Sequence, residues 1–155
     1  SVDWIHKFPN LLVCRTFSKA YGLAGLRVGY GLASKKIVDL MNRVRQPFNT
    51  GSISQIAAME ALKDQKFLVD SAKLNIAGMK QITSAFKTNS VPFITSFGNF
   101  VSFQVEDSER TYNALLKQGV IVRPVGAYGL KNYLRVSIGL QKENEKFINA
   151  LNKTI

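Results

Sequence analysis

The sequence predicts an α/β fold in which a helix-rich part is followed by a small α/β layer. Short apolar runs at 11–15 and 26–33 are typical of strands, and helical spacing dominates 35–88. The remainder of the chain follows the order β, α, β, β, α. We therefore expect two domains, spanning residues 1–88 and 89–155. With 155 residues, 46% of them hydrophobic and 20% charged, the composition is that of a folded protein.

The elements of the first domain follow from apolar spacing and from the residues that start and stop helices. The run at 11–15 predicts a buried strand, with Cys14 in the core, that ends in a turn of Thr, Ser and Gly residues. The second strand, 26–33, is broken by glycines. Three helices are expected, over 35–46 after a Ser34 N-cap, from Ser52 or Ser54 as N-cap through Leu62, and over 66–88.

The second domain is expected to combine half-buried strands with two helices. Apolar and polar residues alternate along two early segments, and Gly119 stands where a helix C′ glycine would. The predicted elements are strands at 92–95 and 99–105, a helix at 108–118, strands at 120–122 and 133–138, and a helix at 142–151.

The charge pattern bears on the possible partners of the chain. Twenty-one Lys and Arg against ten Asp and Glu give a net charge of +11, but no basic run exceeds the pair Lys35-Lys36. This spread argues against a polybasic tail, and we expect no nucleic-acid partner. Lysines recur every seven residues along the predicted long helix, which we interpret as a solvated face rather than a surface for an acidic partner. They are Lys66, Lys73, Lys80 and Lys87.

Several other classes of protein are also disfavoured. No apolar stretch approaches the roughly 20 residues of a membrane helix, and the first residues lack the pattern of a signal peptide. One cysteine, Cys14, and one histidine, His6, leave no internal disulfide and no usual metal site. We expect a cytoplasmic protein with no metal and no membrane partner. Because Ser1 is not a natural initiator, we also expect that sequence is missing upstream.

The segment after the first strand carries the residues best suited to chemistry. Within 16–30 it holds the hydroxyls of Thr16 and Ser18, the amine of Lys19, several glycines and the guanidinium of Arg27. An arginine binds phosphate with two parallel hydrogen bonds, and hydroxyls add shorter contacts. A lysine in a partly buried turn beside an arginine is favoured in its neutral form, which can attack a carbonyl. The segment therefore predicts a phosphate site with a reactive amine.

The same segment, TFSKAYGLAGLRVGY, resembles the cofactor-lysine segment of the fold-type I pyridoxal-phosphate aminotransferases of classes I and II, most closely their histidinol-phosphate branch. The resemblance implies pyridoxal 5′-phosphate as the cofactor. It makes Lys19 the catalytic residue that forms the Schiff base and moves protons. It also implies that Thr16, Ser18, Lys19 and Arg27 bind the cofactor.

The second half of the chain resembles the small domain of the same family. The run GVIVRP at 119–124, followed by YLRVSIG at 133–139, is similar to its pair of small-domain strands, and FGNFV at 97–101 to a further strand. The resemblance implies that Arg135 binds the carboxylate or phosphate of the substrate. Arg123 is similar to a second anion-binding arginine of the histidinol-phosphate branch.

The resemblance covers nearly the whole chain and implies the C-terminal part of an aminotransferase, namely the end of the large domain plus the small domain. The family's cofactor-pairing aspartate lies upstream, so this chain alone is expected to lack a competent site. The intact protein is expected to be a homodimer that uses an amino acid or a phosphorylated amine, with glutamate and 2-oxoglutarate as the second pair. Three alternatives remain open: an aromatic aminotransferase, a threonine-phosphate decarboxylase and a non-catalytic remnant.

Overall fold

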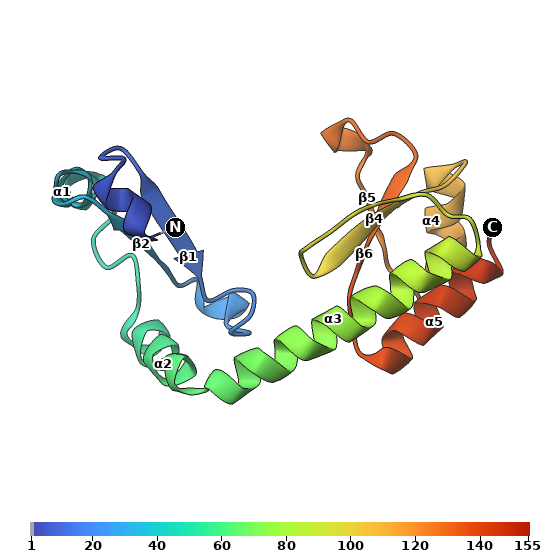
Figure 1. The fold of residues 1–155 in the computed structure, drawn as a ribbon, viewed down its shortest axis with the longest axis horizontal. Coiled ribbons are helices and arrows are strands. Elements are labelled where there is room, and N and C mark those ends of the chain that lie inside the picture. The colour runs from blue at the N-terminus through green and yellow to red at the C-terminus, as the bar shows by residue number, and fades with distance from the viewer. Residues whose placement is uncertain (1) are drawn as a thin grey trace. The chain divides into compact units, whose positions relative to one another are not determined.

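The protein forms two compact units in a computed structural model that describes residues 2–155 (Figure 1). The first unit ends at Ser71 and the second runs from Ala72 to Ile155, so the division falls inside a long helix, α3 (Gln65–Thr88). The boundary predicted near residue 89 coincides with the end of this helix. The division of the intact protein into domains 1–88 and 89–155 stays a prediction.

The first unit is built around an antiparallel hairpin and two helices. Its elements are a short 3₁₀ helix (Val2–His6), β1 (Leu12–Thr16), a 3₁₀ turn (Ala24–Leu26), β2 (Gly29–Ala33), α1 (Lys35–Val44) and α2 (Ser52–Lys63). β1 pairs with β2 so that Thr16 lies opposite Gly29. A small core of Phe17, Val28 and Ala58 lies beyond this end of the hairpin.

Three expectations for the first unit are corrected by the structure. The second strand begins only at Gly29, because Leu26 belongs to the 3₁₀ turn. Of β1 only Val13 is buried, and Cys14 is exposed, because a two-stranded sheet offers each residue few neighbours. The N-cap of α2 is Gly51, and Ser54 uses its hydroxyl elsewhere.

Gly29 allows the two strands to approach closely at the end where the candidate site lies. A Cβ atom at this position would lie 2.6 Å from the carbonyl oxygen of Arg15, far inside van der Waals contact. Immediately beyond it, the Phe17 amide donates to the Val28 carbonyl oxygen at 3.2 Å and continues the pairing. Gly29 thus allows β1 and β2 to pair closely at the point where the loop between them begins.

The second unit is a four-stranded antiparallel sheet with helices packed on one face. Strand order is β3-β4-β6-β5. The elements are β3 (Phe93–Ile94), β4 (Phe100–Gln104), α4 (Ser108–Lys117), β5 (Arg123–Pro124), a 3₁₀ turn (Gly126–Tyr128), β6 (Tyr133–Ser137) and α5 (Gln141–Asn152). The aromatic centre of its core is formed by Phe86 of α3, Phe103 of β4 and Phe147 of α5, whose ring centroids lie 5.0 to 6.1 Å apart. Figure 1 shows α5 alongside the second half of α3.

The end of α4 explains why the strand predicted at 120–122 does not form. Gly119 adopts φ +69 at C′, as expected, and its amide donates to the Leu116 carbonyl. The Val120 amide donates back to the Leu115 carbonyl at 3.0 Å and is therefore used by the helix end. Pairing with β6 begins only at Arg123 and covers two residues.

A matched pair of glycine substitutions tests the close approach at Gly29. Gly29→Ala is expected to speed hydrogen exchange of the Phe17 amide by about fivefold or more, because relieving the contact with the Arg15 carbonyl costs about 1 kcal/mol or more. Gly25→Ala is the control, since a Cβ at Gly25 meets no atom within 4 Å. Equal exchange rates in the two variants would contradict the assignment.

Candidate functional site

The connection between β1 and β2 gathers four of the predicted site residues in one loop. Thr16 ends β1, and its Oγ1 accepts a hydrogen bond from the Ser18 amide at 3.0 Å. Because the Phe17 amide binds the Val28 carbonyl, Arg27 enters the loop from the opposite strand next to this pair. The fold therefore brings Thr16, Ser18 and Arg27 to the same end of the hairpin. Their role in binding a cofactor stays a prediction.

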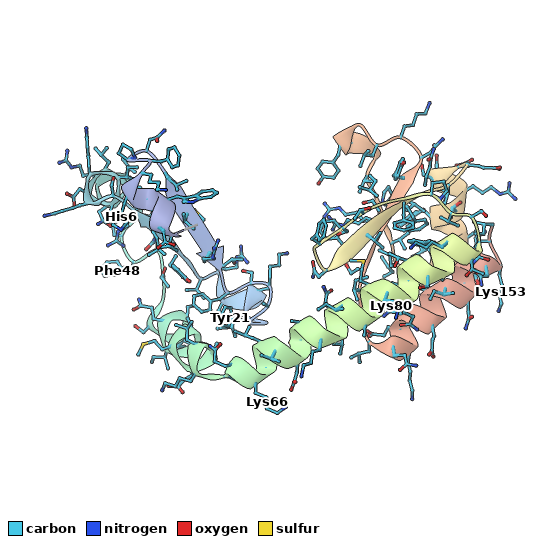
Figure 2. All side chains as sticks on the ribbon, in the orientation of Figure 1. His6, Tyr21, Phe48, Lys66, Lys80 and Lys153 are labelled. Carbon is cyan, nitrogen blue, oxygen red and sulfur yellow. The ribbon has the colours of Figure 1, made fainter. Side chains whose placement is uncertain are left out.

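Lys19 lies in the tight turn that follows, where the Gly22 amide donates to its carbonyl oxygen at 2.9 Å. Its side chain is exposed rather than partly buried, because the core of this loop is filled by Phe17 and its aromatic neighbours. The Tyr21 ring packs on Phe17 with centroids 4.8 Å apart, and Figure 2 shows Tyr21 in this turn. Within residues 2–155 the Lys19 ammonium makes no hydrogen bond or ion pair.

Arg27 occupies a conformation that residues with side chains seldom adopt. Its φ is 50° in the left-handed region, at the end of the Ala24–Leu26 turn. Its Nη1 donates to the Ala24 carbonyl oxygen at 2.7 Å, which uses one of the five N–H donors of the guanidinium. The other donors have no partner among the described residues and are available to an anion.

Ser54 supports this loop through a contact that the sequence did not predict. Its hydroxyl donates to the Leu26 carbonyl oxygen at 2.9 Å in a part-buried position, and so ties α2 to the residue before Arg27. A serine at a helix start normally indicates a cap, and nothing in the local sequence links it to a residue 28 positions earlier.

The chemistry of the loop fits a phosphate-bearing carbonyl compound. Residues 17–28 contain a lysine and an arginine and no acidic residue. The hydroxyls of Thr16 and Ser18 and the free donors of Arg27 suit phosphate oxygens. The amine of Lys19 is a nucleophile for an aldehyde.

Two further predicted residues, Arg123 and Arg135, meet on the sheet of the second unit. They lie directly opposite each other on β5 and β6. In β6 the side chains of Leu134 and Val136 are buried against the helices, so Arg135 lies on the other face of the sheet. The Arg135 guanidinium carbon lies 4.6 Å from the centroid of the Phe100 ring on β4.

No salt bridge within residues 2–155 neutralises this arginine pair. Two like charges directly opposite on neighbouring strands repel each other, yet among residues 2–155 no ion pair involves either arginine. Both residues line a cavity of about 630 Å³ that is also lined by Lys146 and by Glu143, whose carboxylate accepts a hydrogen bond from the Leu140 amide. The arrangement places two guanidinium groups on one face of the sheet, and such a concentration of positive charge attracts anions. It belongs to the second unit, whereas the Lys19 loop belongs to the first.

Other features considered in the sequence carry no comparable chemistry. The part of the chain that the structure describes holds no group of three or more His, Cys, Asp or Glu side chains suited to a metal ion. No helix in residues 2–155 has the length and apolar character needed to cross a membrane. Lys66 and Lys80 project from α3 in Figure 2, and Lys66 pairs with Asp70. The interpretation of the lysine stripe as a solvated face stays a prediction.

Comparison with known proteins identifies the family to which the chain is similar. Residues 2–151 match the family model of aminotransferase class I and II. The chain is 55% identical over its full length to histidinol-phosphate aminotransferase 1 of Dechloromonas aromatica, and covers 43% of that protein. It is 54% identical to histidinol-phosphate aminotransferase of Methylobacillus flagellatus and covers 42% of it. The chain thus spans about two fifths of the length of these relatives.

Solved structures have the same fold. The histidinol-phosphate aminotransferase of Clostridium acetobutylicum superposes with a TM-score of 0.89 at 26% identity, over 98% of this chain and 48% of that one. The enzyme of Sinorhizobium meliloti in complex with pyridoxal-5′-phosphate gives a TM-score of 0.86 at 27% identity, over 97% of this chain and 43% of that one. The fold expected for the chain is therefore confirmed.

Removing one of the two opposed arginines tests whether they repel each other. Arg123→Gln is expected to raise the free energy of unfolding of the second unit by about 0.2 to 1 kcal/mol at low salt. The gain should shrink in about 1 M NaCl, where the screening length falls to ~3 Å. Urea unfolding followed through the amide signals of Val101 and Leu134 measures it. Arg110→Gln is the control, since Arg110 is exposed on α4. A destabilised Arg123→Gln variant would show that the arginine has a structural partner.

Proposed function

The chain belongs to the aminotransferase class I and II family, and on this premise we propose that the intact protein is a pyridoxal 5′-phosphate-dependent aminotransferase of the histidinol-phosphate type. The observation that carries the proposal is the Lys19 loop. It joins hydroxyls, a free amine and an arginine with unused donors in a segment without acidic residues. The whole-chain identity of 55% to a histidinol-phosphate aminotransferase supports the substrate class.

The loop residues would hold the cofactor in two ways, through contacts to its phosphate and through a covalent bond. Thr16, Ser18 and Arg27 would bind its phosphate, and Lys19 would bind it covalently through Nζ. The cofactor supplies an electron sink for the carbanion at the substrate's α-carbon. The Thr16 hydroxyl is already oriented, because its oxygen accepts the hydrogen bond from the Ser18 amide.

Lys19 would also move the proton of the reaction. Its exposed Nζ has no ion-pair partner within residues 2–155, so the amine is free to reach the substrate. It would take the proton from the α-carbon and hold it on Nζ. Lys19 is therefore the proposed catalytic residue.

The arginine pair would recognise the substrate. Arg135 would clamp the carboxylate of glutamate and 2-oxoglutarate, since a guanidinium makes two parallel bonds to a carboxylate. Arg123, directly opposite, would add a second positive charge for a phosphate dianion. The pair suits an amine substrate that carries a phosphate or a carboxylate.

The remaining features of the intact protein are part of the same proposal. We expect a cytoplasmic homodimer, divided into a large domain ending near residue 88 and a small domain from 89 onward. Its substrates are small molecules. The cofactor site would be completed by parts of the protein outside this chain, since the chain covers 43% of a full-length relative.

Covalent trapping tests the role of Lys19. Borohydride reduction of the intact protein with pyridoxal 5′-phosphate is expected to fix the cofactor on Lys19, because it is the only lysine in 17–28, the loop that holds the proposed phosphate-binding residues Ser18 and Arg27. Peptide mapping by mass spectrometry identifies the site. Lys19→Arg should abolish the labelling, and the control Lys36→Arg, on an exposed helical position, should retain it. Labelling spread over several surface lysines would refute the assignment.

Substitution of Arg135 tests the substrate class. Arg135→Lys in the intact enzyme is expected to lower kcat/KM for glutamate and for a phosphorylated amine together, by about 1 to 3 kcal/mol or roughly ten- to a hundredfold. A lysine keeps the charge but not the two-pronged contact. Steady-state kinetics measure the loss, with Arg110→Lys as the control, and trapping at Lys19 should persist. Unchanged kinetics for both substrates would make Arg135 a structural residue.

A further inference from the structure

We propose that Phe100 is a positioning residue that orders the Arg135 guanidinium for anion binding without occupying any of its N–H donors. This inference rests on the proposed function, in which Arg135 binds the substrate anion. It is carried by the contact of 4.6 Å between the guanidinium carbon and the centroid of the Phe100 ring. No hydrogen bond or ion pair within residues 2–155 holds the Arg135 side chain.

The sheet register explains how the two side chains meet. Arg135 lies opposite Ser102, and Phe100 lies opposite Ser137, so Phe100 and Arg135 are diagonal neighbours on one face of β4 and β6. Diagonal neighbours are within reach of each other when one is aromatic and the other is long. The contact therefore follows from the pairing of the strands.

The type of contact matters for anion binding. The N–H donors of a guanidinium lie in its plane, and an aromatic ring attracts the cation through the ring's face. A carboxylate partner would instead use the donors that the substrate needs. The ring can thus restrict the rotamers of Arg135 while its donors stay free.

Attraction to the Phe100 ring also counteracts the repulsion between the guanidinium groups of Arg135 and Arg123. β6 lies between β4 and β5, so Phe100 and Arg123 stand on opposite sides of Arg135. Attraction to the ring draws the guanidinium towards β4. The two positive charges are then held apart while both remain on the same face.

The loop that precedes Phe100 lies beside its ring. An added Cβ at Gly98 would be 3.6 Å from Phe100 Cε1, so the edge of the ring borders this glycine. The Gly98 carbonyl oxygen accepts a hydrogen bond from Asn75 Nδ2 at 3.1 Å, which ties the loop to α3. With 37% of its surface exposed, Phe100 is not a core residue, and its aromatic character is not needed to fill the core.

Two substitutions separate the effect of the aromatic face of Phe100 from the effect of its apolar volume. Phe100→Leu keeps an apolar side chain and removes the aromatic face, whereas Phe100→Tyr keeps the face. The first measurement is the Nε–Hε resonance of Arg135 by NMR of this chain, assigned through its loss in Arg135→Lys. Shielding by the ring should shift it upfield of the Arg110 resonance in the parent and in Phe100→Tyr, but not in Phe100→Leu. Unchanged amide signals of Val101 and Phe103 report that each variant is folded.

The second measurement is a titration with glutarate, a dicarboxylate probe, followed at the same resonance. Phe100→Leu is expected to weaken binding about two- to fivefold, and Phe100→Tyr to match the parent, as expected for a cation–π contact near the surface. Equal binding in all three proteins would overturn the role of Phe100 while leaving the anion site intact. No response of Arg135 to glutarate in the parent would overturn the anion-binding role of Arg135, and the positioning role with it.

Discussion

Burial of Leu134 and Val136 fixes the register of β6 and thereby the face of the sheet on which Arg135 lies. Leu134 is fully buried and Val136 is 6% exposed, in the core that contains Phe86 and Phe103. Burying one such side chain contributes about 1.5 to 3 kcal/mol. A slip of one residue would expose both and drive Arg135 into the apolar core without a partner, which is far more costly. The core therefore holds the guanidinium on the open face.

Local patterns in the sequence were enough to predict most helices and strands. They could not predict contacts between residues that lie far apart in the chain. Helix α1 could be predicted from its apolar spacing. The C′ role of Gly119 could be predicted from its position just after α4. The Lys19 segment could be recognised because its chemistry is concentrated in a few consecutive residues. The exposure of Lys19 depends instead on which side chains fill the core of its loop, and no local pattern reports that.

The contacts that define the candidate site were missed for the same reason. The hydrogen bond from Ser54 to the Leu26 carbonyl and the stacking of Phe100 on Arg135 both join separate elements. Arg123 could be aligned only loosely from the sequence, because the loop between it and the strand of Arg135 varies in length within the family that the chain resembles. Its place opposite Arg135 appears only once β5 and β6 are paired. Strand pairing, rather than composition, makes the two arginines neighbours.

Arg27 adopts a left-handed backbone conformation that its flanking residues impose. A left-handed conformation costs a residue with a side chain about 1 to 2 kcal/mol, and glycine avoids the cost. The flanking residues impose it, since the Leu26 carbonyl is held by Ser54 and Val28 is buried and paired with Phe17. The loop contains other glycines, so the sequence accommodates glycine nearby. The strain at Arg27, together with guanidinium donors that have no partner within residues 2–155, therefore supports the proposal that this side chain binds an anion.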